Sequence, residues 1–405
     1  MARVRHPLSL FLITIPIIGS IAGALKWNDV VIFTLNIIGL VLLGSWISRS
    51  VDAMTVGGSR AVNELLKSTL GNSVELMVMF NGSSIPTNAD GQTMQIGINA
   101  IVQKRAQIAQ SVILGSILSN LLLVLGGSLF YSGYDQKRLR FDRTLTTVLS
   151  SLMMVVFILL ALPTIMDIFP STKATPADQI LFMQRTTALI LVALLLTFLV
   201  FRLGTHATMF ASTPFSPRDQ ACGEYEARQS HTVEPQIPQL YIDKRIAVLI
   251  LAVASASALA CSYYIVGSLS GVASITGAKQ SFIAVTLIPL VGNSMKYYTI
   301  VVGCRSCNQV ELGIRAVINT VLRVTMLVAP LLVLTGWVFN QPLTLRFDGF
   351  EATILLLSVV IMTYLISDGR SNYFEGLMLV GTYAIITISF FVRPEIPPNV
   401  IFLGS

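Results

Sequence analysis

Two short stretches in the two halves of the chain begin with the same three residues and indicate how the protein is built. Residues 71–76 read Gly-Asn-Ser-Val-Glu-Leu, and residues 292–297 read Gly-Asn-Ser-Met-Lys-Tyr. Each stretch lies in apolar surroundings and places an ionisable side chain, Glu75 or Lys296, two residues after the shared triplet. Matching helix-interrupting motifs in the two halves of an apolar chain are typical of proteins built from inverted membrane repeats.

The composition around these motifs excludes a water-soluble globular protein. The 405 residues are 54% hydrophobic and only 12% charged, with a mean hydropathy of +0.74, whereas soluble domains carry about 25% charged residues. We therefore predict an all-α polytopic membrane protein with about eleven transmembrane helices. The apolar runs cover residues 8–25, 29–47, 61–80, 97–132, 143–169, 183–203, 245–269, 279–303, 308–339, 350–367 and 372–392.

The one long polar segment divides the chain into two halves. It contains four prolines that break helices, and it lies between six apolar runs, the first of which is the N-terminal span, and the five that follow it. The predicted parts are an N-terminal span (residues 1–28), a first repeat (29–203), a linker (204–244) and a second repeat (245–405). An odd number of spans gives the repeats opposite orientations, so a binding site is expected at their interface near the membrane midplane.

The basic residues predict the orientation in the membrane. With the N-terminus and the linker in the cytosol, fifteen of the 27 lysines and arginines face the cytosol and eight face the other side. This bias agrees with the positive-inside rule. The basic residues form no stripe with interleaved aromatics, so we expect membrane lipid and no nucleic acid as a partner. Cys304 and Cys307 form a CxxC pair without a second ligand pair, so no zinc site is assigned.

Several motifs together resemble the calcium/proton exchanger (CAX) family of the cation/calcium exchanger superfamily. Residues 71–76 resemble its first signature, and residues 115–126 resemble the span that follows. Residues 289–293 resemble its second signature, while 336–351 and 368–376 resemble connections between its last helices. The resemblance implies that two glutamates, one from each signature, meet at the midplane and bind a divalent cation or protons in turn.

The chain departs from this family at the second signature. Glu75 matches the first glutamate, but Lys296 stands where the second belongs, and Tyr297 stands where a histidine is usual. In a polar stretch that aligns with residues 319–323, a glutamine has become Arg323. An ammonium group beside the ligand position repels a dication in a medium of low dielectric constant. Ordinary Ca²⁺ transport is therefore not expected.

The expected function is secondary cation/proton exchange at a vacuolar or other internal membrane, with altered ion selectivity. Glu75 would cycle protons, neutral oxygens would suit a monovalent cation, and the basic side chains would suit an anion. No metal site is assigned and no cofactor is expected. The candidate ion-binding or coupling residues are Asn72, Glu75, Ser116, Asn120, Asn293, Lys296 and Arg323.

Two alternatives use the same residues and stay open at this point. In the first, the scaffold is a membrane enzyme in which Glu75, Lys296 and Tyr297 supply acid and base groups for isomerisation or cyclisation of a small apolar substrate. In the second, the protein is a transport-inactive homologue in which Glu75 and Lys296 form an internal pair.

The first half carries an insertion near Asn81 to Gln95. There are 44 residues between Gly71 and Gly115, but only 27 between Gly292 and Asn319. The inserted residues are polar and include a glycosylation sequon at Asn81. We expect a polar lumenal loop here.

Overall fold

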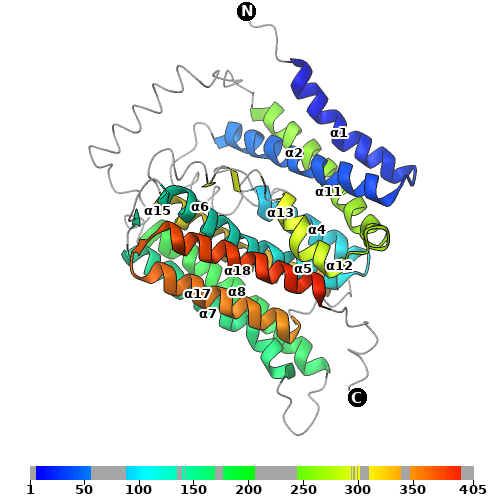
Figure 1. Ribbon diagram of the computed structural model, residues 1–405. Helices are drawn as coiled ribbons and strands as arrows, with labels where there is room; N and C mark the ends of the chain where they lie inside the picture. Colours follow the sequence, from blue (N-terminus) through cyan, green and yellow to red (C-terminus); the bar gives the residue numbers. More distant parts are fainter. Residues whose placement is uncertain are drawn as a thin grey trace, which may run out of the picture.

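The computed structural model describes most of the helical part of the chain. The described residues are 6–55, 88–134, 139–141, 143–168, 177–205, 244–292, 294, 297–298, 300–301, 310–338 and 347–393. Within them the chain is almost entirely helical, which confirms the predicted all-α class (Figure 1). Seven of these helices are long and apolar enough to cross a membrane. The total of eleven spans and the domain limits stay predictions.

The first half supplies an N-terminal helix and a set of long helices. The elements are α1 (His6–Ala24), α2 (Asp29–Thr55), α4 (Asn88–Val102), α5 (Ala106–Leu118), the π-helical turn η1 (Ser119–Val124), α6 (Leu125–Gly133), strand β1 (Leu139–Arg140), α7 (Arg143–Ile168), α8 (Ala177–Val200) and η2 (Phe201–Thr205).

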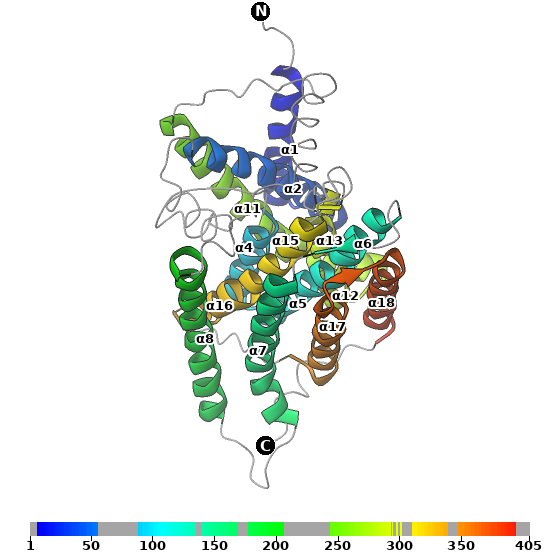
Figure 2. The same ribbon diagram turned by 90° about the vertical axis from the view of Figure 1, so that its left-hand side faces the viewer.

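The second half repeats this arrangement with different lengths. Its elements are α11 (Lys244–Thr276), α12 (Gln280–Phe282), η3 (Ile283–Leu287), α13 (Ile288–Gly292), α15 (Val310–Arg323), η4 (Val324–Val328), α16 (Ala329–Val338), α17 (Gly349–Ser367), strand β2 (Arg370–Ser371) and α18 (Tyr373–Val392). The longest helices of the two halves, α2 and α11, pack along each other, with α1 beside them at one side of the bundle (Figures 1 and 2).

The centre of the bundle consists of two interrupted helices at matching places in the two halves. One is α5–η1–α6 and the other is α15–η4–α16, and each changes from α to π geometry near its middle. Their most apolar windows are 89% and 72% buried, against 22–50% for the other spans. Short π-helical turns inside α-helices are frequent at functional sites. The two interrupted helices are therefore the first place to look for a site.

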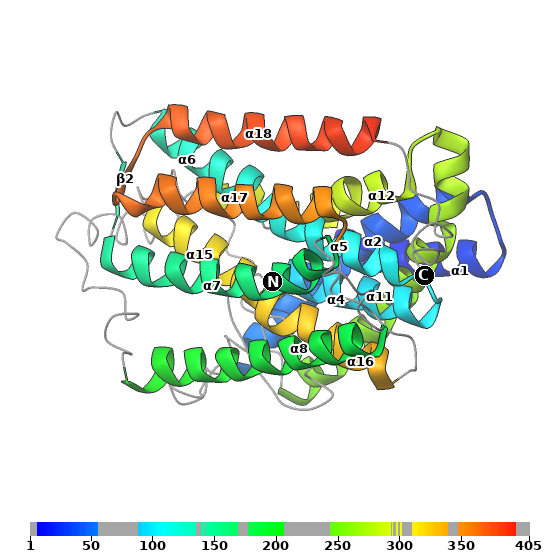
Figure 3. The same cartoon turned by 90° about the horizontal axis from the view of Figure 1, so that it is seen from below.

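The helices α17 and α18 form a hairpin on the outside of this centre. The first packs on α7 and the second on α6, as Figure 3 shows from below. Close contact between α18 and α6 depends on small residues, because a Cβ on Gly376 would overlap the backbone of Gly126 and Phe130. Small residues let membrane helices approach each other closely.

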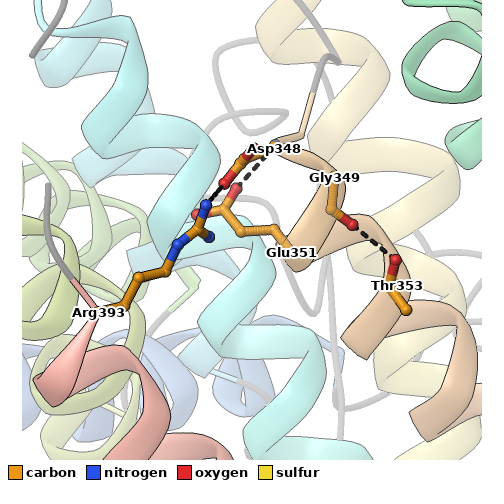
Figure 4. Close-up of polar contacts among 5 residues, drawn as sticks. All are labelled: Asp348, Gly349, Glu351, Thr353 and Arg393. Carbon is orange, nitrogen blue, oxygen red and sulfur yellow. Dashed lines mark hydrogen bonds and ion pairs between the residues drawn. The ribbon is translucent and has the colours of Figure 1, made fainter. Parts of the chain in front are cut away.

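The open end of this hairpin is held by charged and aromatic contacts (Figure 4). Asp348 caps α17 and forms an ion pair with Arg393, whose guanidinium carbon lies 4.5 Å from the ring centre of Phe350. Glu351 accepts a hydrogen bond from the backbone N–H of Asp348 (3.3 Å). In the first turn Thr353 also donates to the carbonyl of Gly349 (2.7 Å). These contacts fix the start of α17 beside the end of α18.

Two expectations about the insertion and the following span were wrong. The predicted span 97–132 is two helices, because α4 ends at Val102 and Lys104 has a φ of 59° before α5 begins. The loop expected up to Gln95 is helical from Asn88 onward, and Met94 and Gln95 are buried. The reason is a stripe of polar side chains on α4 that lowers its hydropathy although it packs inside the bundle.

This polar stripe of α4 is bonded to α11. Asn99 donates to the hydroxyl of Ser262 (2.6 Å) and to the carbonyl of Leu259 (3.2 Å). Further along α11, Gln103 donates to the carbonyl of Tyr263 (3.0 Å) and Arg105 donates to the carbonyl of Val266 (3.0 Å). Hydrogen bonds satisfy buried amides at little cost, so polar residues here indicate a buried helix and no loop.

Candidate functional site

The first interrupted helix carries two buried polar residues with oxygens that lack a partner. Ser116 and Asn120 are fully buried, on α5 and η1. The amide nitrogen of Asn120 donates to the carbonyl of Ser116 (2.6 Å). The Ser116 hydroxyl and the Asn120 Oδ1 make no hydrogen bond with the described residues. An unsatisfied buried group costs about 1–3 kcal/mol, so two such residues one helical turn apart make this part of the helix a candidate ligand site.

The second interrupted helix also carries, on α15, a buried side-chain oxygen without a hydrogen-bond partner in the described part of the chain. The Oδ1 of Asn319 is buried and also lacks a hydrogen-bond partner among the described residues. Thr320, next to it, donates to the carbonyl of Ala316 (2.8 Å). In the predicted alignment of the two repeats Asn319 corresponds to Gly115, which has no side chain, so the repeat did not identify Asn319 as a ligand.

Arg323 brings a positive charge to the junction of α15 and η4. Its side chain is half-buried, and its Nε donates to the backbone carbonyl of Asn319 (3.3 Å). The helix α15 packs against η1, which contains Asn120. The Arg323 side chain therefore lies in the same central part of the bundle as the unpartnered oxygens.

The helix that carries the second signature lies directly against α5. A Cβ on Gly115 would overlap the carbonyl of Val285 in η3 and approach the ring of Pro289 in α13. Only a residue without a side chain permits this approach. The contact places Ser116, one residue further along α5, beside the helix that leads into residues 292–297.

Four predicted site residues lie outside the described part of the chain: Asn72, Glu75, Asn293 and Lys296. Tyr297 is described, and its hydroxyl donates to the carbonyl of Pro289 (3.2 Å). The structure thus brings Ser116, Asn120 and Arg323 into one central region and assigns Tyr297 a contact within its own segment. Among the residues that the structure describes, no three His, Cys, Asp or Glu side chains lie together as a metal site.

Gln95 is a further buried polar residue that sequence reasoning missed. It is 1% exposed on α4, and its Oε1 has no hydrogen-bond partner among the described residues. The sequence placed it in a loop. The signal that was overlooked is the run of apolar residues on both sides of it, from Met94 to Ile101.

Comparison with known proteins gives a consistent result. The sequence model of the family described as "Sodium/calcium exchanger protein" matches residues 28–204 and 246–392. A vacuolar calcium ion transporter of Schizosaccharomyces pombe is 30% identical over 395 residues, covering 96% of this chain and 85% of the relative. A Ca²⁺/H⁺ antiporter of Aphanothece halophytica is 27% identical over 378 residues, covering 92% and 93%.

Solved structures show the same fold. The structure of native YfkE superimposes with a TM-score of 0.71 at 21% identity, covering 95% of this chain and all of that one. The crystal structure of an H⁺/Ca²⁺ exchanger CAX gives a TM-score of 0.66 at 12% identity, covering 97% and 90%. The predicted resemblance to the CAX family is thereby confirmed. The chain belongs to the sodium/calcium exchanger family, as a CAX member whose second signature carries Lys296.

Proposed function

We propose that the protein is a secondary cation/proton exchanger of a vacuolar-type membrane whose selectivity is shifted away from Ca²⁺ toward a monovalent cation. One observation carries this proposal. Ser116 Oγ, Asn120 Oδ1 and Asn319 Oδ1 are buried oxygens without hydrogen-bond partners among the described residues, on two helices that pack together. Neutral oxygens that are not committed to other donors are suitable ligands for a cation. The names of the relatives, vacuolar calcium ion transporter and Ca²⁺/H⁺ antiporter, support membrane exchange against protons.

The net charge of the two signature residues, Glu75 and Lys296, favours a monovalent ion over a divalent one. Glu75 and Lys296 sum to zero without a bound ion, so a dication leaves a net charge of +2 and a monovalent ion leaves +1. The cost of a buried net charge rises with its square in a continuum description, and it is already several kcal/mol for one ion in a protein. Arg323 adds to this cost in the same region.

The enzyme alternative receives less support from the described residues. It requires a Tyr297 hydroxyl that is available to a substrate, but this hydroxyl donates to the Pro289 carbonyl. That contact supports a structural role for Tyr297, because it joins Tyr297 to a residue eight positions earlier in the same segment. The enzyme and the transport-inactive homologue are therefore treated as outcomes of the test.

The test is ion-driven proton movement in proteoliposomes. Vesicles with an acidic interior and an internal pH dye receive Ca²⁺, Mn²⁺, Na⁺ or K⁺ outside. We expect Na⁺ or K⁺ to drive proton efflux and Ca²⁺ to leave the internal pH unchanged. Robust efflux with Ca²⁺ contradicts the selectivity, while no efflux with any ion contradicts exchange. In that second case a co-purifying apolar molecule favours the enzyme, and its absence favours the inactive homologue.

A pair of serine variants links the result to the site. Ser116→Ala removes an unpartnered hydroxyl, and we expect the half-saturating cation concentration to rise about tenfold, the effect of about 1.4 kcal/mol. Ser128→Ala is the matched control, because Ser128 is equally buried on the same span but its hydroxyl already donates to the carbonyl of Leu125 (2.8 Å). Equal effects of the two variants would exclude Ser116 as a ligand.

A further inference from the structure

Four spanning helices meet at a small two-stranded ribbon at one end of the molecule. The connection from α6 to α7 contains β1, and the connection from α17 to α18 contains β2. The two strands pair in antiparallel orientation, and the Phe141 N–H donates to the Gly369 carbonyl (3.2 Å). Figure 3 shows β2 beside the ends of these helices. Since all four are candidate membrane spans, the ribbon lies at the level of the membrane surface.

The register of the ribbon brings arginines together. Arg140 and Arg370 are direct cross-strand partners in the backbone register of the ribbon. Gly369 has a φ of +68°, and a Cβ there would lie 3.1 Å from the Cβ of Arg143. The turn therefore runs against the first turn of α7, and Arg143 lies beside the same ribbon.

The described guanidinium groups at this ribbon are not neutralised by the protein. Arg143 and Arg370 are exposed, and neither makes a hydrogen bond or ion pair with the residues that the structure describes. The nearby carboxylate of Glu375 is already bonded to Ser371 Oγ (2.8 Å) and Asn372 Nδ2 (3.1 Å). In sequence, the two connections contain the basic residues Lys137, Arg138, Arg140, Arg143 and Arg370 and the acidic residues Asp135, Asp142 and Asp368. The excess charge is positive.

Exposed aromatic side chains surround the ribbon and indicate its depth. Tyr134 follows α6 and is 76% exposed, and Tyr364 in the last turn of α17 is 77% exposed. Tyr373 and Phe374, at the start of α18, are also exposed. Aromatic residues of this kind concentrate at the headgroup level of a bilayer. The unpaired arginines are thus at the height of lipid phosphates.

We propose that this ribbon binds the phosphate-bearing headgroup of an anionic phospholipid, with Arg143 and Arg370 as its ligands. A guanidinium presents two parallel N–H groups to phosphate oxygens, and basic residues beside a membrane span attract anionic lipids of the cytosolic leaflet. The positive-inside bias of the sequence assigns this end to the cytosol. Because the connections that contain Arg143 and Arg370 belong to different halves of the chain, a headgroup bound by these two arginines holds the two halves together.

The test measures lipid binding to the full-length protein in a neutral detergent after delipidation. The probes are a phosphatidylinositol phosphate, phosphatidylcholine and a soluble inositol phosphate, read by native mass spectrometry and by the thermal midpoint. We expect retention of the phosphoinositide and a raised midpoint, with neither effect from phosphatidylcholine. For the double variant Arg143→Gln/Arg370→Gln we expect an affinity about 30-fold weaker, from two surface charges.

Two controls keep the result decisive. The double variant Lys26→Gln/Lys104→Gln removes two exposed charges that follow α1 and α4, and it should bind the phosphoinositide like the wild type. Arg143→Lys/Arg370→Lys retains the charge and the fold if the glutamine variant is poorly folded, and it should bind more weakly than wild type. The proposal is overturned if Lys26→Gln/Lys104→Gln loses as much phosphoinositide affinity as Arg143→Gln/Arg370→Gln. It is also overturned if the wild type retains phosphatidylcholine as well as the phosphoinositide. Binding of the soluble inositol phosphate without the lipid overturns the lipid assignment.

Discussion

Lys296 and Arg323 are the residues in which this chain differs most in charge from what the CAX resemblance implies. Arg323 lies on α15 in the central region that contains the unpartnered oxygens of Ser116, Asn120 and Asn319, whereas Lys296 lies outside the described residues. A neutral oxygen tolerates either a small cation or a proton donor, whereas a buried cation requires a counter-charge. For this reason we predict that Lys296 pairs with Glu75.

The first prediction concerns Glu75 and Lys296 as a coupled pair. Equivalent positions of two inverted repeats face each other, so Glu75→Gln or Lys296→Met should each leave an unpaired buried charge and destabilise the protein by about 3–5 kcal/mol. The double variant should recover much of the loss in thermal midpoint, measured in detergent.

Glu311 and Arg315 provide the control for this cycle. They form an ion pair one turn apart on α15, with side chains 33% and 16% exposed. A partly exposed pair contributes about 0–1 kcal/mol, so the same double-variant cycle should show little coupling there. Additive losses at Glu75 and Lys296 would show that these two residues do not meet.

The second prediction separates transport from catalysis at Tyr297. Tyr297→Phe removes the hydroxyl that donates to Pro289, which should cost about 1 kcal/mol of stability. Ion-driven proton flux should stay within about twofold of wild type, since the hydroxyl is engaged within its own segment. A complete loss of activity with an intact thermal midpoint would favour the enzyme alternative.

At this scale the sequence predicted part of the site. Ser116, Asn120 and Arg323 were identified from motifs, and the structure brings their helices together. Asn319 and Gln95 were missed because an amide in an apolar helix carries no motif of its own. Whether its oxygen has a partner depends on tertiary contacts that no local pattern contains.

The π-helical turns connect single residues to whole elements. The turn η1 begins three residues after Ser116 and contains Asn120, and η4 follows directly after Arg323. A π turn shifts the hydrogen-bond pattern of the helix and redirects the side chains at that point. The sequence predicted these two spans as continuous helices, because period and hydropathy do not distinguish a π turn from an α turn.

The third prediction concerns the contact between α6 and α18. Gly376→Ala places a methyl group 2.6 Å from the Gly126 carbonyl oxygen and against Phe130, and overpacking of this kind costs about 1–3 kcal/mol. Gly381→Ala on the same helix has nothing within 4 Å and should be neutral or slightly stabilising. Thermal unfolding of the two variants in detergent measures the difference. Equal midpoints would mean that the helices do not approach as closely as described.

The helix α4 shows where sequence patterns are insufficient at the element scale. Its Gln95, Asn99 and Gln103 gave the segment a polar composition, which favoured a loop. In the structure Asn99 and Gln103 bond to α11, a helix that begins about 140 residues later in the chain. The helix that supplies the partners of Asn99 and Gln103 is distant in the chain, and the local sequence does not reveal it.

The arrangement of the whole molecule agrees with the alternation of spans that the sequence predicts. The pairing of β1 with β2 joins two connections assigned to the same side. Lys279 and Asp348 both contact Arg393, which places three residues assigned to the opposite side together (Figure 4 shows the Asp348 contact). The all-α membrane fold was therefore predictable from charge and hydropathy, whereas the helix boundaries near the insertion were not, and the total of eleven spans stays a prediction.

The fourth prediction is the absolute orientation. Because fifteen basic residues are assigned to one side and eight to the other, the linker should face the cytosol. A tag placed at Gln220 should be cleaved by protease added to sealed right-side-out vacuoles, while a tag after Ser405 should be protected. Protection of the Gln220 tag would reverse the orientation.

The central claim is that Lys296 and Arg323 are the reason for a selectivity shifted away from Ca²⁺. It is tested most directly by ⁴⁵Ca²⁺ uptake into proteoliposomes with an acidic interior, comparing wild type with Lys296→Glu and with Lys296→Glu/Arg323→Gln. We predict uptake at the level of empty vesicles for the wild type, incomplete recovery for Lys296→Glu, and a clear increase for the double variant, abolished by collapsing the pH gradient. Wild-type uptake equal to that of the double variant would contradict the account.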